Sequence, residues 1–249
     1  MTYKNSFFIL IILLVVMMVN SCESENNDSL SNTVINGNIG TLTDIDNNTY
    51  KIVKIGDQWW MAENLKVTHY SDGSEIKLIT NNEEWKAIQY TNNIKAYCFY
   101  ENDSSMLMKY GNLYNWMAAT NNITENKTYI QGVCPNGWHL PSDEEWHILT
   151  LYLGIDSAGG KIKETGTINW SKPNDYATNE SGFTALPGGF RGINYGSFER
   201  ESYNAYWWTS SELDNDNAWL RGIGYLNKNI YVGNSPKAFG NSVRCVKNL

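Results

Sequence analysis

The sequence predicts an α+β domain in which short antiparallel strands are joined by two or three short helices and long loops. Strand-like segments gather toward the two ends of the chain, and the helical patterns lie between them. Gly, Pro and Asn interrupt the chain at short intervals, which limits the length of each regular element. Strands and helices do not alternate, as a parallel sheet with helical crossovers would require.

The length and the charge of the chain narrow the class of protein further. The 249 residues fit one domain of about 200 residues with short additions. The net charge of −7 and the lack of Lys and Arg clusters argue against nucleic acid as a partner. The 10 Trp and 16 Tyr need a folded core or a binding surface, which excludes intrinsic disorder over most of the chain.

The N-terminal segment is predicted to be a sorting signal. An unbroken apolar run from Phe7 to Val19 has the length of a signal-peptide core, and a spanning helix needs roughly 20 residues. The run ends in Val-Asn-Ser-Cys at residues 19–22, which resembles the lipobox of bacterial lipoproteins. This resemblance implies cleavage of residues 1–21 and lipidation of Cys22, whose acyl chains would hold the protein on a membrane. The alternative is an ordinary secretory signal with a chance cysteine near its end.

A polar linker follows the predicted lipidation site. Residues 22–40 are rich in Asn and Ser and nearly free of large apolar side chains, so we expect a flexible tether before a domain at 41–249. The acidic residues directly after Cys22 resemble the surface-export signal of lipoproteins in Gram-negative bacteria. The expected location is therefore the bacterial outer membrane, with the domain lipid-anchored and exposed at the cell surface.

The domain is predicted to begin with a hairpin. Strand-like residues 49–55 and 58–61 flank a turn at Gly56-Asp57. The preceding segment 44–48 has the composition of a turn, and as a Ca²⁺ loop it lacks the glycine and the distal Glu of an EF-hand.

Three segments then carry helical patterns. Residues 82–88 and about 112–119 are predicted as short helices from the spacing of their apolar side chains. The best-defined helix is 143–153, because Ser142 can cap its N-terminus and Glu145 can close a capping box. After long loops, antiparallel strands are expected at 206–211, 218–221, 229–232 and 242–246.

Three cysteines remain when Cys22 is assigned to the lipid. A loop-rich exported domain gains from a cross-link, and we favour a disulfide between Cys134, before the capped helix, and Cys245, in the last strand. Cys98 is then expected to be a buried free thiol. The pairs Cys98–Cys134 and Cys98–Cys245 remain open as alternatives.

Eight motifs follow one another between residues 44 and 246. They are Asp44–Tyr50, Ile55–Leu65, Lys109–Trp116, Cys134–Trp146, Ala177–Phe183, Ala185–Arg191, Trp207–Glu212 and Ser242–Val246. In this order they closely resemble the Fibrobacter succinogenes major paralogous domain over residues 41–249. The resemblance implies an exported protein or lipoprotein in a family whose biochemical function is unknown.

The motifs at 207–212 and 242–246 in turn resemble elements of the C-type-lectin fold and of its relative, the formylglycine-generating fold. This implies a C-type-lectin-like domain and carries no activity by itself. The Glu-Pro-Asn, Gln-Pro-Asp and Trp-Asn-Asp triplets with which such lectins hold Ca²⁺ and sugar are absent, and residues 214–217 are only a loose likeness. No cofactor or metal is therefore expected, and nothing in the sequence supports a structural Ca²⁺.

Binding is favoured over catalysis, so we do not expect an enzyme. The Gly-x-Ser-x-Gly elbow is absent, and Cys134 with His139 is better explained as a disulfide half and a packed turn histidine. Aromatic rings stack on sugars, and carboxylates beside them bind hydroxyl groups. Because Trp207 and Trp208 point to opposite faces of a strand, at least one is expected in the core. The candidate ligand-binding residues are Trp207, Trp208, Trp219, Asp214, Asp216 and Tyr225.

The sequence therefore predicts a lipid-anchored surface protein with one extracytoplasmic binding domain, and glycan is the favoured ligand. A protein-recognising adhesion or scaffold module is the first alternative, and a predominantly buried set of aromatic residues would favour it. A hydrolase or modifying enzyme of the envelope is the second, and a cleft with converging carboxylates would favour that.

Overall fold

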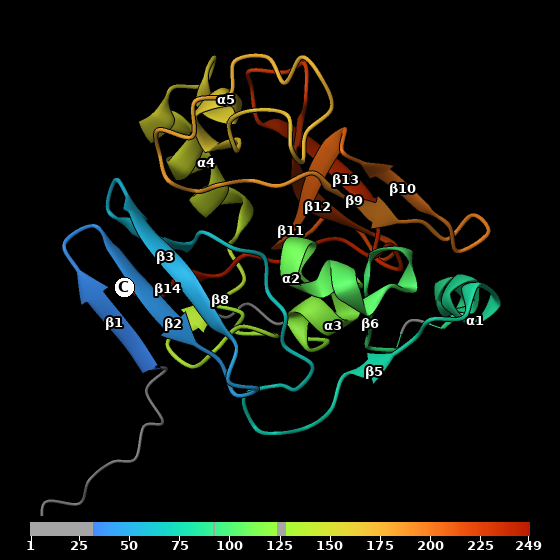
Figure 1. Cartoon of the computed structure of the whole chain (residues 1–249). Coiled ribbons are helices and arrows are strands. Elements are labelled where there is room, and N and C mark those ends of the chain that lie inside the picture. Colours follow the sequence, from blue (N-terminus) through green and yellow to red (C-terminus); the bar gives the residue numbers. More distant parts are fainter. Residues whose placement is uncertain (1–31, 92, 124–127) are drawn as a thin grey trace, which may run out of the picture.

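The computed structural model describes residues 32–249 except 92 and 124–127 (Figure 1). The described residues form three sheets, with short helices between them and at one end. In Figure 1 the N-terminal strands, in blue, lie at one side of the molecule, and the C-terminal strands, in orange and red, lie at another. This is the sheet-rich α+β arrangement that the sequence predicts.

The largest sheet joins the two ends of the chain. Its C-terminal strand lies between two strands that are distant in sequence, so the end of the domain is built into the sheet that begins it. In spatial order the strands are β1 (Asn32–Asn36), β2 (Ile39–Thr43), β3 (Thr49–Ile55), β4 (Gln58–Met61), β14 (Val246–Lys247) and β8 (Trp138–His139).

The second sheet has five strands, and all but one of its neighbouring pairs are antiparallel. The exception is the parallel contact of Ala205 with Gly189. In spatial order the strands are β10 (Phe198–Glu201), β9 (Gly188–Arg191), β11 (Asn204–Glu212), β12 (Asn217–Gly224) and β13 (Tyr231–Pro236). A small third sheet contains β5 (Lys77–Leu78), β6 (Ala96–Cys98) and β7 (Leu113–Tyr114).

The described residues contain five α-helices, where two or three were expected. They are α1 (Asn82–Ala87), α2 (Leu107–Tyr110), α3 (Trp116–Thr120), α4 (Asp143–Leu153) and α5 (Ala158–Ile162). Three short 3₁₀ helices accompany them: η1 (Ile88–Tyr90), η2 (Tyr100–Asn102) and η3 (Ser104–Met106). The predicted α4 is confirmed with its capping box, since Ser142 Oγ accepts from Glu145 N and the Glu145 carboxylate accepts from Ser142 N.

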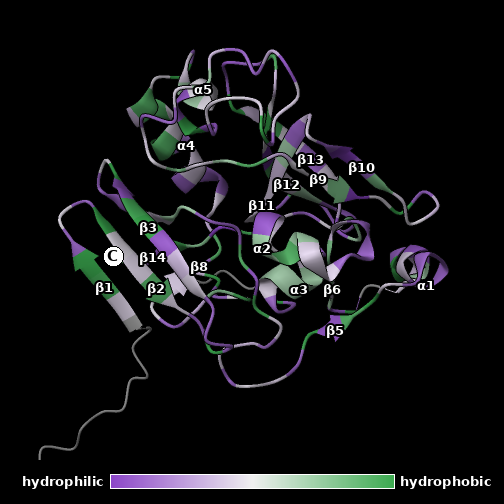
Figure 2. Cartoon of the chain, viewed as in Figure 1, coloured by the Kyte–Doolittle hydropathy of each residue, from purple (hydrophilic) through white to green (hydrophobic). Residues whose placement is uncertain are grey.

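The hairpin at 49–61 is also confirmed, but the folded region begins earlier than predicted. Residues 32–40 were expected in the flexible tether, and they form β1 and the start of β2 instead. Val34, Ile35 and Ile39 remain exposed, and much of β1 is green in Figure 2. Backbone pairing rather than burial of apolar side chains therefore holds this hairpin, so its sequence lacks the pattern of buried residues by which a strand is predicted. The predictions for residues 1–31, including Cys22, lie outside the described residues.

Two other boundaries differ from the prediction. The helix expected at about 112–119 starts only at Trp116, because Asn115 caps it and Leu113–Tyr114 pair with β6. The strand expected at 242–246 is reduced to β14, because this segment crosses from one sheet to the other. Ser242 bridges to Trp207 in the second sheet, whereas Val246 pairs with Trp60 in the first.

One buried side chain links the parts of the chain that meet at this crossing. Asn64 Oδ1 accepts from Arg244 Nε at 2.8 Å and from Trp207 Nε1 at 2.9 Å. Asn64 Nδ2 donates to Tyr110 O at 2.8 Å and to Ser242 Oγ at 3.1 Å. The amide therefore uses both of its donors and both lone pairs of its oxygen, and every partner is distant in sequence.

Four tyrosine hydroxyls are buried with partners in the same core. Tyr50 Oη donates to Asp44 Oδ2 at 2.5 Å and accepts from Lys66 N at 2.9 Å. Tyr114 Oη donates to Val67 O at 2.6 Å. Burial, which disfavours the phenolate, raises the pKa of all four hydroxyls, those of Tyr50, Tyr70, Tyr110 and Tyr114.

We expect Asn64→Leu to lower the free energy of unfolding by about 3–5 kcal/mol, because the buried Arg244 and Trp207 donors lose their shared acceptor. Urea denaturation followed by tryptophan fluorescence measures the loss. The matched control, Asn229→Leu at an exposed position, should change stability by less than about 0.5 kcal/mol. A loss for Asn64→Leu no larger than that of the control would contradict the central role of this amide.

We expect the buried tyrosines to contribute stability that is lost as the pH rises above about 10, the ordinary tyrosine pKa. Above that pH the unfolded chain releases phenol protons that the folded chain retains, so unfolding is favoured. Tyrosinate absorbance should therefore rise in two steps, the exposed rings first and the buried rings only with unfolding. In the Tyr114→Phe variant, the second rise in absorbance should be smaller by the contribution of one tyrosine. If all tyrosines of the native protein titrate in a single step near pH 10, the prediction is wrong.

Candidate functional site

The structure buries the two tryptophans that led the predicted ligand site. Trp207 and Trp208 have no exposed surface, so both belong to the core and neither can stack on a ligand. Trp207 Nε1 donates to Asn64 Oδ1, and Trp208 Nε1 donates to Tyr114 O at 2.8 Å. Their assignment as binding residues is therefore wrong, because the two faces of β11 are covered by separate parts of the core.

The other predicted residues do not form one site. Trp219 and Tyr225 are half-buried near opposite ends of β12, and Tyr225 packs edge-on against Tyr203 with ring centroids 5.3 Å apart. Asp214 is exposed, but its Oδ1 accepts from Asp216 N and Asn217 N at 2.8 Å each and thereby shapes the turn between β11 and β12. These bonds lower the pKa of the Asp214 carboxyl.

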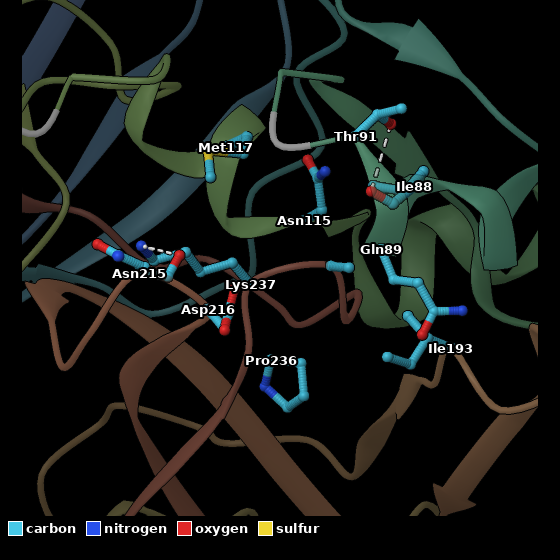
Figure 3. Close-up of a pocket in the computed structure, with 11 residues that line it drawn as sticks. Ile88, Gln89, Thr91, Asn115, Met117, Ile193, Asn215, Asp216, Pro236 and Lys237 are labelled. Atoms are coloured by element: carbon cyan, nitrogen blue, oxygen red, sulfur yellow. Dashed lines mark hydrogen bonds between the residues drawn. The ribbon is translucent and has the colours of Figure 1, made fainter.

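Asp216, in contrast, lines a pocket. The pocket has a volume of about 190 Å³ and lies between the β11–β12 turn, the start of α3, the end of α1 with η1, and the segment that follows β13. In Figure 3, Asp216 and Gln89 lie on opposite sides of it, with Pro236 below and Met117 above. Among the described residues no hydrogen bond engages the Asp216 carboxylate, so both oxygens are available to a ligand.

The neighbouring charges in this pocket are already neutralised. Lys237 Nζ hydrogen-bonds to Glu212 Oε1 and to Asn215 O, the second at 2.9 Å, and lies 4.9 Å from the centroid of the Trp116 ring. The buried lysine therefore serves to hold the β11–β12 turn against α3. What the pocket offers a ligand is one free carboxylate, amide groups and aliphatic surface, a set that suits a neutral polar molecule.

A row of partly exposed aromatic rings lies on the second sheet and was missed in the sequence. Tyr231 packs edge-on against Tyr206 (6.1 Å), Tyr206 against Phe190 (5.5 Å), and Phe190 stacks on Phe239 (5.5 Å). Phe239 N donates to Pro236 O at 2.9 Å, so one turn carries both a wall of the Asp216 pocket and the end of the row. This row supplies the ring faces that the tryptophans cannot.

Two strand glycines could have indicated the row. A Cβ on Gly222 would lie 2.2 Å from Tyr231 Cε1, and one on Gly233 would lie 2.5 Å from Tyr231 Cε2. The ring of Tyr231 therefore lies directly on the backbone of two strands, yet 44% of the residue stays exposed. A glycine inside a strand is the sequence signal for such a close approach.

The three cysteines of the domain behave as predicted. Cys134 and Cys245 form a disulfide, which closes a loop across 111 positions and ties β14 to the segment before α4. Cys98 is buried and free, and burial raises the pKa of its thiol to about 12. A neutral thiol is a poor nucleophile, so the structure gives no reactive role to Cys98.

His139 is held by structural contacts. Its Nε2 lies 2.7 Å from Glu145 Oε1 and its Nδ1 lies 2.7 Å from Asn248 Oδ1, and the ring packs on Tyr129 with centroids 4.2 Å apart. Glu145 is largely buried, which would raise its carboxyl pKa, but the bonds from His139 and Ser142 outweigh burial and lower it. This network links the capping box of α4 to the C-terminal end of the chain.

The predicted turn at 44–48 is confirmed as well. Asp44 Oδ1 accepts from Asp46 N and Asn48 N at 2.9 Å each, while its Oδ2 accepts from Tyr50 Oη. The part of the chain that the structure describes contains no group of three His, Cys, Asp or Glu side chains placed to hold a metal ion. Nor does this part contain a helix that is long and apolar enough to cross a membrane.

The fold and its disulfide define a sheet-rich α+β domain with one small polar pocket beside an aromatic row. Residues 53–247 match the model of the Fibrobacter succinogenes major domain, and the chain therefore belongs to this family. The match confirms the resemblance seen in the sequence motifs. No curated protein and no solved structure matches the chain in the same comparisons.

Proposed function

We propose that the protein is a carbohydrate-binding module, held at the bacterial cell surface by a lipid on Cys22. The observation that carries the proposal is the Asp216 pocket, where a free carboxylate and the amide of Gln89 lie on opposite sides. Carboxylate and amide groups bind sugar hydroxyls, and the adjoining rings of the aromatic row can stack on a pyranose face. With about 190 Å³, the pocket suits a single sugar ring at the end or side of a glycan.

A C-type-lectin-like fold remains part of this proposal. It rests on the motifs at 207–212 and 242–246, whose residues build β11 and the crossing between the two large sheets. That crossing brings the end of the chain back to the N-terminal hairpin, which leaves the loops around β11, β12 and β13 to form a binding surface. This likeness is one of architecture and carries no ligand by itself.

A protein-recognising module is the second candidate. The outer face of α4 exposes apolar side chains at helical spacing, with exposed fractions of 45%, 50% and 66% for Ile148, Leu151 and Tyr152. In addition, eight of the ten tryptophans are buried in the core. The pockets around Asp216 and around Glu63 each contain a single carboxylate, so neither provides the pair that a glycosidase needs.

The full-length protein should bind one class of sugar on a glycan and polysaccharide array, probed with and without Ca²⁺. We expect Asp216→Ala to weaken that binding by about tenfold or more, because a charged hydrogen-bond acceptor is lost. Tyr231→Ala should weaken it several-fold through loss of stacking on the aromatic row.

Asp156→Ala is the matched control, since Asp156 is exposed outside the pocket. It should leave sugar binding unchanged. No binding by the folded native protein to any glycan would reject the carbohydrate proposal, and a search for protein partners on the face of α4 would then be favoured.

The anchor is tested separately. Cys22→Ala should abolish lipid attachment, so that the protein is no longer processed as a lipoprotein and its precursor retains residues 1–21 or is released. Fractionation of cells that express the native chain and the variant, with labelling by a palmitate analogue, gives the measurement. Equal labelling and membrane retention of both chains would show that Cys22 is not the acylated residue.

A further inference from the structure

A second hollow lies away from the Asp216 pocket, between the first sheet and α2. A pocket of about 190 Å³ there is lined by Lys66, Lys109 and Arg244. It adjoins a groove of about 630 Å³ over β1, β2 and β3, and the two share Ala62, Glu63 and Thr184 in their walls. The pocket and the groove therefore form one cleft with two chemically different parts.

Arg244 is the unusual residue of the pocket. It is 1% exposed, and it donates from Nε to Asn64, from Nη1 to Phe183 O and from Nη2 to Thr184 O. Three of its five N–H donors thus have partners, and among the described residues no carboxylate hydrogen-bonds to the guanidinium. Burial lowers the pKa of Arg244 to about 9, and the negative charge of Glu63 offsets part of that effect.

Arg191 shows how the same chain satisfies an arginine that has only a structural role. It is equally buried, and it makes five hydrogen bonds to backbone and amide oxygens around it. All of its N–H donors are used. Arg221 is buried as well and also leaves donors unused, but its guanidinium pairs with the Asp143 carboxylate. Arg244 therefore differs from Arg191 in its two free donors and from Arg221 in having no carboxylate at hydrogen-bond distance, and it lines a pocket.

The other charges of the pocket leave a net positive potential. The Glu63 carboxylate accepts from Lys51 N at 3.0 Å and from Lys66 Nζ at 3.4 Å, so Lys66 balances it. Lys109 Nζ lies 3.7 Å from Glu201 Oε1, too far for a strong hydrogen bond, and its side chain is 35% exposed at the rim. The three cations Lys66, Lys109 and Arg244 thus exceed the two carboxylates Glu63 and Glu201 by one charge, which favours an anion here although the net charge of the protein is −7.

The groove has the opposite character. Its walls contain the aliphatic side chains of Val34, Ile39 and Val53, and no aromatic ring of the described residues lines it. Val34 and Ile39 are 66% and 64% exposed, so apolar surface remains to be covered there. Polar residues also line the groove, namely Asn36, Thr41, Lys51, Glu63 and Thr184, but most of its accessible surface is apolar. Such a surface suits a hydrocarbon segment better than a sugar.

Thr184 marks the junction of the two parts. Its φ of +54° places a β-branched residue in the left-handed region, a conformation that is costly for threonine. Asn179 holds it there through Thr184 N and Oγ1, at 2.8 and 3.0 Å, and this directs Thr184 O to Arg244. The strained backbone therefore fixes the orientation of the guanidinium at the point where the groove meets the pocket.

We propose that this cleft binds an aliphatic carboxylic acid, with its carboxylate on Arg244 and Lys109 and its hydrocarbon part in the groove over β1–β3. The planar guanidinium can offer its free donors to a carboxylate, and Lys109 supplies a second charge at the rim. The proposed site shares no lining residue with the Asp216 pocket and does not depend on the carbohydrate proposal.

The first test uses the full-length protein in lipid nanodiscs, with empty nanodiscs as reference, and measures binding of hexanoate by calorimetry. Hexanoate should bind at least tenfold more tightly than acetate, because its extra methylenes enter the groove. It should also bind at least tenfold more tightly than hexanamide, which is similar in shape and carries no charge. Glucuronate, an acidic sugar, should bind more weakly than hexanoate.

The second test assigns the site to these residues. Lys109→Ala should weaken hexanoate binding about tenfold, whereas Lys86→Ala, a lysine of similar exposure on α1, should not change it. Val34→Asp should weaken hexanoate binding and leave acetate binding unchanged. Ile35→Asp, on the opposite face of the same strand, is its control.

Several outcomes would overturn the proposal. They are the absence of hexanoate binding by the folded protein, equal binding of hexanamide, tighter binding of glucuronate, or full binding by both Lys109→Ala and Val34→Asp. Arg244→Lys keeps the charge and removes the planar fork, so it should weaken binding like Lys109→Ala. Thermal unfolding identifies whether that variant is folded, and the two other variants decide the matter if it is not.

Discussion

The fold depends on the hydrogen bonds of one buried amide, Asn64. Its oxygen accepts from Arg244 and Trp207, and its nitrogen donates to Tyr110 and Ser242. These four partners come from the last segment of the chain, from β11 and from α2. Because a buried amide with unmet hydrogen bonds is costly, this geometry requires the two large sheets and the middle of the chain to assemble together.

The same constraint explains why the tryptophans are buried. Trp207 donates to Asn64, and its ring lies 5.7 Å from those of both Trp146 and Phe183. Trp208 packs on the opposite side of β11 and donates to Tyr114. With both faces of the strand covered, ligand contact is left to the turn at Asp216 and to the row that ends at Tyr231, and both lie at the periphery of the second sheet.

Buried cations hold the loops together, and the manner in which each is satisfied distinguishes structure from binding. Arg191 is surrounded by five acceptors, and Lys163 donates to the carbonyls of Asp175, Gly224 and Tyr225. The backbone carbonyls of long loops lack the regular partners that helices and sheets provide, and buried cations such as these donate hydrogen bonds to them. Arg244 also donates to three acceptors, but two of its N–H donors are unused and it lines the pocket that adjoins the groove over β1–β3.

The local elements and the family could be predicted from the amino-acid sequence. The capping box predicts α4 and the turn at Gly56-Asp57 predicts the hairpin, because each of these signals acts over few residues. The disulfide between Cys134 and Cys245 was favoured among few alternative pairings. Of the six predicted ligand-binding residues, Asp216 lines a pocket of the described part of the chain, and the others line neither this pocket nor the cleft over β1–β3. Only the tertiary structure decided that Trp207 and Trp208 are core, that β1 joins the first sheet, and that Arg244 borders a cleft. The physical reason is that burial depends on which faces meet across separations such as the 180 positions between Asn64 and Arg244, and no local pattern encodes that meeting.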